Sequence, residues 1–100
     1  MSESQRLDKF LWCARFAKSR SAAARLIADG VVTMSGRAVK PHHAIHVGDK
    51  FSLLRGRADL RVTVLALGER RGPAAEARQL YTAETAAPSA AEPWVALIED

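Results

Sequence analysis

The sequence predicts an α+β fold, in which two N-terminal helices pack on a small, mostly antiparallel twisted sheet and a short helix follows. Two observations predict it. Apolar residues recur at helical spacing up to Gly30, and β-branched or alternating apolar residues replace that pattern afterwards. A length of 100 residues, 48% of them hydrophobic, is enough for one domain with one core.

The first helix is predicted over residues 6–17, where the apolar residues fall on one helical face. These apolar residues are Leu7, Phe10, Leu11, Ala14 and Ala17. Ser4 is the candidate N-cap, and Asp8 in the first turn suits the positive end of a helix. Trp12 and Phe16 fall on the face opposite the apolar stripe, which predicts an exposed aromatic pair.

The second helix is predicted over residues 20–29, a stretch without a helix breaker. Ser19 is its expected N-cap, and Gly30 stands where a left-handed residue commonly ends a helix. Ser21 and Arg25 are four residues apart and share the face opposite the apolar residues.

A β-hairpin follows. Residues 31–34 are rich in β-branched side chains, and residues 37–39 can return beside them across the turn at Ser35 and Gly36. Pro41 ends the second strand because proline cannot serve the interior of a ladder. Residues 41–49 are predicted to form a loop.

Alternating apolar residues predict two further strands, over residues 51–53 and 60–65. A proline suited to the first turn of a helix precedes residues 74–81, the third predicted helix. Small residues, proline and glutamate then predict a linker over residues 83–93. The apolar tail, residues 94–98, is expected either to add a strand to the sheet edge or to cover the exposed face of the first helix.

The charge is distributed unevenly along the chain. The net charge is +4 overall, but residues 1–61 carry +7 and residues 62–100 carry −3. Such an asymmetry is typical of a surface that binds a polyanion, although an ordinary solvated surface gives the same count.

Other classes of protein are disfavoured. The single cysteine, Cys13, excludes an intramolecular disulfide framework. No apolar run is long enough for a membrane-spanning helix, and the N-terminus lacks the apolar segment of a signal peptide. We therefore expect a cytoplasmic protein without a membrane partner.

The sequence contains no pattern typical of catalysis, so we expect no enzyme activity, no catalytic residues and no cofactor. Three histidines, His42, His43 and His46, share one predicted loop, but Asp49 is the only nearby carboxylate. A metal site is therefore not expected. These histidines either contact a phosphate or a base, or belong to an ordinary loop.

The most informative segment is residues 15–25, with four basic residues and no acidic one. It joins the two predicted helices and opens the second with a serine. Unpaired amides at the start of a helix attract anions, and arginine suits phosphate recognition. The alternative is an ordinary capped helix with solvated charges, but the segment favours RNA binding.

At these residues the chain resembles the S4-type RNA-binding domain, named after ribosomal small-subunit protein four. The resemblance lies in Arg6-Leu7-Asp8-Lys9, Ser19-Arg20, the run from Gly30 to Gly36, and Gly48-Asp49. It implies an S4-type domain over residues 6–67, which we expect to be followed by a short appended helix over residues 68–82 and an acidic linker with an apolar tail over residues 83–100.

A narrower resemblance rests on Trp12, the run Ala14-Arg15-Phe16 and residues 68–81. These are similar to a family of small bacterial ribosome-associated heat-shock proteins of about fifteen kilodaltons. Where that family has a lysine-rich C-terminal extension, residues 83–100 are net acidic here. The resemblance implies non-catalytic binding to ribosomal RNA of the free large ribosomal subunit that still carries peptidyl-tRNA.

The charge pattern and the S4-type resemblance select the same RNA-binding residues: Arg6, Lys9, Arg15, Lys18, Ser19, Arg20, Arg25, Arg37 and Lys40. We expect a monomer that associates with ribosomes. Two alternatives stay open. One is an accessory module of an RNA-modifying enzyme or translation factor, and the other is a protein-interaction module that uses Trp12, Phe16 and Trp94.

Overall fold

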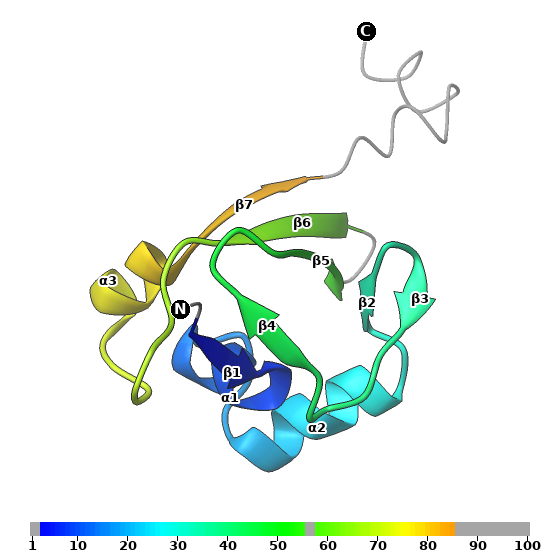
Figure 1. Cartoon of the computed structure of the whole chain (residues 1–100), viewed down its shortest axis with the longest axis horizontal. Helices are drawn as coiled ribbons and strands as arrows, with labels where there is room; N and C mark the ends of the chain where they lie inside the picture. Colours follow the sequence, from blue (N-terminus) through cyan, green and yellow to red (C-terminus); the bar gives the residue numbers. More distant parts are fainter. Residues whose placement is uncertain (1–2, 56–57, 86–100) are drawn as a thin grey trace, which may run out of the picture.

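A computed structural model describes residues 3–55 and 58–85 and confirms the α+β class (Figure 1). None of the helices in these two ranges is long and apolar enough to cross a membrane. In chain order the elements are β1 (Ser4–Arg6), α1 (Leu7–Cys13), α2 (Arg20–Ala28), β2 (Val32–Met34), β3 (Arg37–Ala38), β4 (Ala44–His46), β5 (Lys50–Arg55), β6 (Ala58–Val64), α3 (Ala74–Ala77), the 3-10 turn η1 (Arg78–Leu80) and β7 (Tyr81–Thr85).

The strands form two antiparallel sheets. The larger has five strands in the order β3-β2-β5-β6-β7, and the smaller pairs β1 with β4. Figure 1 shows the five-stranded sheet curving over α1 and α2, with β1 running directly into α1.

The core fills the space between α1, α2 and the inner face of the large sheet. Alternation along β5 and β6 buries Phe51, Leu53, Val62 and Val64 against the helices, and leaves Arg61 exposed on the outer face. The ring of Phe10 from α1 meets that of Phe51 edge to face, with 6.0 Å between their centroids.

Both predicted signals of α2 are confirmed. The Ser19 hydroxyl accepts a hydrogen bond from the Ala22 amide at 3.0 Å. At the other end Gly30 has a φ of +80°. The Gly30 amide donates to the Ile27 carbonyl and the next amide to the Leu26 carbonyl, the hydrogen bonds of a Schellman ending.

The predicted bounds of the first helix were wrong at both ends. Ser4 lies in β1 and caps nothing; the first amides of α1, those of Leu7 and Asp8, donate to carbonyls of residues 43 and 41 instead. The helix ends at Cys13 because the chain makes a second Schellman ending, with Arg15 at a φ of +66° in the position usually taken by glycine.

This early ending also corrects the prediction for Phe16. Beyond the helix its ring turns inward, half-buried, with its centroid 6.4 Å from Phe51 and 4.7 Å from Tyr81. Trp12 is also half-buried. The exposed aromatic pair predicted on the first helix is therefore absent.

Three further predictions were wrong because strands form in segments expected to be loop, helix or linker. The loop predicted over residues 41–49 contains β4, and the helix predicted over residues 74–81 shortens to α3 and η1 because Tyr81 begins β7. Residues 83–85 belong to β7, which pairs with β6, and not to a linker. The rest of that linker and the predicted apolar tail lie outside the described residues.

Candidate nucleic-acid interface

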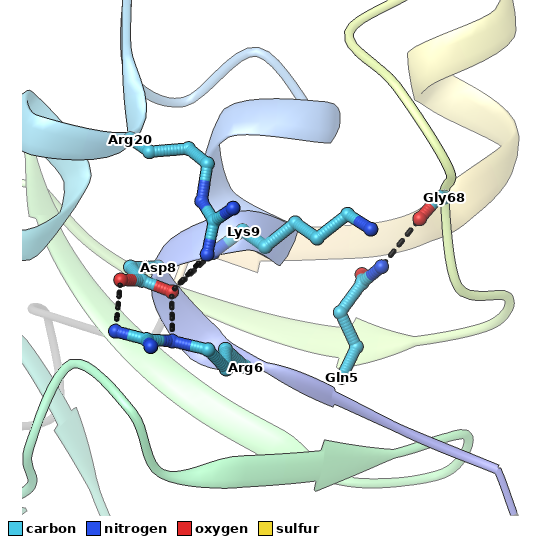
Figure 2. A network of polar contacts seen from close by, with 6 residues as sticks. All are labelled: Gln5, Arg6, Asp8, Lys9, Arg20 and Gly68. Atoms are coloured by element: carbon cyan, nitrogen blue, oxygen red, sulfur yellow. Dashed lines mark hydrogen bonds and ion pairs between the residues drawn. The ribbon is translucent and has the colours of Figure 1, made fainter.

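A buried carboxylate lies at the centre of the basic surface formed by β1, α1 and the start of α2. The side chain of Asp8 is only 6% exposed. The Arg6 guanidinium donates to both of its oxygens, at 3.1 Å from Nε to Oδ1 and 2.9 Å from Nη2 to Oδ2. The Arg20 Nη2 lies 3.7 Å from Oδ1, which joins the start of α2 to the same carboxylate (Figure 2).

The neighbours of this network also come from separate parts of the chain. The Lys9 amide donates to Asp8 Oδ1 at 2.7 Å, and the Lys9 side chain is half-buried. The Gln5 side-chain amide donates to the Gly68 carbonyl, which ties β1 to the segment before α3 (Figure 2). Arg6, Lys9 and Arg20 therefore share one surface.

Two more of the predicted residues, Lys18 and Arg25, line one groove beside α2. Its volume is about 760 Å³, and its wall also includes Phe16, Leu26 and Asp29. Both cationic side chains are exposed, as is Ser19 at the helix start. The groove combines apolar residues and two cations with one acidic residue, Asp29, and the cations and apolar surface suit a nucleotide.

The remaining predicted residues lie outside these two groups. Arg15 is directed toward the segment before α3, where its Nη1 donates to the Gly72 carbonyl at 2.9 Å. Arg37 is exposed in β3 at the edge of the large sheet, and Lys40 is exposed beyond that strand.

The histidine segment has a structural use. The His43 carbonyl accepts from Leu7, and the His46 amide donates to Asp49 Oδ2 at 2.8 Å. Within residues 3–55 and 58–85, no three His, Cys, Asp or Glu side chains gather as they would around a metal ion.

Cys13 is fully buried beside this basic surface. Burial raises the pKa of its thiol, and the charges of Lys9 and Arg20 lower it by a smaller amount. The thiolate is therefore disfavoured, as expected of a cysteine used for packing.

Sequence reasoning selected the cations but missed the groups that hold them. Asp8 was interpreted as an acid in the first turn of a helix and as part of the S4-type motif, without a role toward the cations, and Gln5 was not considered. The two-residue spacing of Arg6 and Asp8 was the one local signal, because the side chain of an extended residue just before a helix can reach the residue two positions later. The contact with Arg20 had no local signal.

Comparison with known proteins identifies the fold family. The S4 domain model matches residues 5–51. Heat shock protein 15 of Escherichia coli strain K12 is 42% identical over 82 residues, which cover 80% of this chain and 62% of that protein. The homolog of Haemophilus influenzae is 38% identical over 82 residues, covering 81% of this chain and 63% of that protein. The chain thus spans less than two thirds of the length of these relatives.

A solved structure agrees with the fold over nearly the whole chain. The trimeric structure of Vibrio cholerae heat shock protein 15 superposes with a TM-score of 0.75 at 34% identity, covering 90% of this chain and 89% of that one. This match covers more of the chain than the S4 domain model, which ends at residue 51. The chain belongs to the heat shock protein 15 family and contains its S4 domain.

Proposed function

We propose that this protein binds structured ribosomal RNA without catalysing a reaction, and that its target is the free large ribosomal subunit carrying peptidyl-tRNA. The observation that carries the proposal is the basic surface at the junction of α1 and α2. There the guanidinium groups of Arg6 and Arg20 meet at Asp8, and Lys9 follows Asp8 in α1, within the S4 match. The S4-type resemblance selects the same residues.

The groove beside α2 extends the proposed surface. Lys18 and Arg25 line it, and Ser19 begins the helix next to it. In this arrangement the cations neutralise phosphates, and Phe16 and Leu26 offer an apolar wall to a base or ribose. The proposed RNA-binding residues are those that the sequence selected: Arg6, Lys9, Arg15, Lys18, Ser19, Arg20, Arg25, Arg37 and Lys40.

Not all of these residues have equal support. Arg15 uses one N–H to hold the Gly72 carbonyl, so only the rest of its guanidinium is free to bind RNA. Arg37 lies at the sheet edge and would contact RNA only if it extends beyond the helix junction, whereas Lys40 precedes Pro41, whose carbonyl accepts from the Asp8 amide. We therefore assign the main contacts to the Asp8 surface and the groove.

The proposal includes a cytoplasmic, ribosome-associated protein that needs no cofactor and is a monomer before it binds. The Vibrio cholerae relative is described as a trimer, so the oligomeric state is measured in the same experiment. A rescue role for stalled large subunits during heat stress follows from the family resemblance.

The test is co-sedimentation of the purified protein with separated small and large subunits, with and without peptidyl-tRNA. We expect preferential binding to the large subunit carrying peptidyl-tRNA. With about six phosphate contacts, log affinity should fall with log salt at a slope of about −4 to −5.5. Analytical ultracentrifugation of the free protein gives its mass.

Other results would redirect the proposal. Equal binding to both subunits would indicate a general RNA-binding module, such as an accessory part of an RNA-modifying enzyme. A slope near zero would favour the protein-interaction alternative, which has lost its exposed aromatic pair because Phe16 packs inward.

A further inference from the structure

We propose that Asp8 is a positioning residue for RNA, which holds the guanidinium groups of Arg6 and Arg20 side by side as one binding site for a backbone phosphate. This inference rests on the proposed RNA-binding function and adds to it a specific role for an acidic residue. Asp8 does not contact the RNA in this scheme. It acts through the two arginines.

The first argument is the cost of burying this charge. Asp8 is 4% exposed as a residue, although a buried carboxylate is unfavourable unless it is well paired. Here it accepts from Arg6 through both oxygens and from the Lys9 amide, and Arg20 lies 3.7 Å away. The carboxylate is therefore fully engaged by groups from the functional surface.

The second argument is that both arginines keep exposed N–H donors for RNA. A guanidinium has five N–H donors, and Asp8 takes only two from Arg6. The Arg6 and Arg20 side chains are still 54% and 47% exposed. Each can thus keep its contact with Asp8 and donate to a phosphate oxygen from its outer side.

The third argument is the separation of the two arginines along the chain. Arg6 ends β1, and Arg20 begins α2 after the turn that follows α1. Like charges from separate elements repel, and each free side chain would lose rotamer freedom when RNA fixes it. A carboxylate between them offsets the repulsion and fixes both before RNA arrives. Figure 2 shows the two guanidiniums meeting at Asp8.

The decisive experiment asks whether removing the charge of Asp8 strengthens or weakens RNA binding. Asp8→Asn raises the net charge from +4 to +5, so simple attraction of a polyanion predicts tighter binding. The positioning role predicts weaker binding, by about tenfold, because two side chains must then be ordered on binding. The probe is protein-free ribosomal RNA of the large subunit, measured by filter binding at fixed salt.

Glu84→Gln is the matched control. Glu84 is exposed in β7 at the edge of the large sheet, outside both the Asp8 network and the groove beside α2, and its loss changes the net charge equally. We expect this variant to bind RNA as tightly as the parent protein or slightly more tightly. If Asp8→Asn also tightens binding, the positioning role is refuted.

A second parent variant, in which both arginines are replaced, separates the positioning role of Asp8 from a general effect on folding. In the variant Arg6→Gln/Arg20→Gln, both groups through which Asp8 acts are gone, so adding Asp8→Asn should weaken RNA binding no further. An equal further loss in that background would show that Asp8 supports the fold alone, and would overturn the inference.

If Asp8→Asn does not fold, as judged by circular dichroism, Arg6→Lys/Arg20→Lys replaces it. This variant keeps the net charge but cannot form the two-pronged contact with the carboxylate. A loss of about tenfold is expected, and unchanged affinity contradicts the inference. Absence of any salt-dependent binding by the parent protein would instead refute the proposed function itself.

Discussion

Neutralising the two cations of the groove should weaken RNA binding far more than neutralising two exposed arginines elsewhere. The variant is Lys18→Gln/Arg25→Gln, and the control is Arg61→Gln/Arg70→Gln. All four side chains are exposed, and each pair lowers the net charge from +4 to +2. Glutamine keeps most of the aliphatic stem, so packing changes little.

The expected magnitude follows from the two phosphate interactions that this variant removes. Lys18 and Arg25 line one groove, and each is assigned one phosphate. A charge-assisted hydrogen bond contributes about 1.5–3 kcal/mol, so removing both interactions weakens binding by about a hundredfold or more. The salt slope should become shallower by about 1.4–1.8, whereas the control variant should bind only a few-fold more weakly, through reduced long-range attraction.

The assay is a titration of fluorescently labelled large-subunit ribosomal RNA at several salt concentrations, with circular dichroism to show that both variants fold. Equal losses of affinity in the two variants would mean that only total charge matters. The groove would then have no assigned role.

Two further predictions concern stability. Gly68→Ala should lower the free energy of unfolding by about 1–3 kcal/mol, because the added Cβ would lie 2.9 Å from Cys13 Cβ in a packed region. Gly72→Ala is the control, since its added Cβ meets only the movable carboxylate of Glu76. Equal melting temperatures of the two variants would contradict the packing argument. Burial raises the pKa of Cys13 above its ordinary value of 9.0, so the thiol of the unfolded chain ionises first as pH rises past that value, and the stability of the folded protein falls there. Between pH 8 and pH 10, the melting temperature should therefore fall more steeply for the parent protein than for Cys13→Ala. Parallel curves would refute this linkage.

The parts of the fold that could be predicted are those with local causes. The serine and glycine that bound α2 act within a few residues, and the alternation of β5 and β6 is visible in any short window. The end of α1 was misjudged because Arg15 takes a left-handed conformation that the sequence signals only when the residue is glycine.

The strands that were missed depend on distant partners. β4 is three residues long and lies among histidines, and it forms because Ser4–Arg6 pair with it from the far end of the domain. β7 contains one tyrosine and two threonines, which suit a strand, but Tyr81 was assigned to the third helix and residues 83–85 to a linker; the strand forms because β6 offers an edge. Both missed strands therefore depend on pairing with a partner that is distant in the sequence.

The candidate site was likewise predictable only in the part that has a local signal. The charge census and the resemblance selected the cations, because charge is a property of composition. The role proposed for Asp8 required knowing that α1 and α2 meet at their N-terminal residues, which only the tertiary structure shows.

The N-terminal strand has a consequence for the order of folding during synthesis. The first two amides of α1 and all of β1 find their partners in residues 41–46, which are translated about forty residues later. At typical rates of translation the delay is on the order of 2–8 s. During that interval the residues that cap α2 are already on the chain, whereas the first turn of α1 lacks its hydrogen-bond acceptors. The surface around Asp8 is therefore completed late on the nascent chain, after the hairpin of β2 and β3 has left the ribosome.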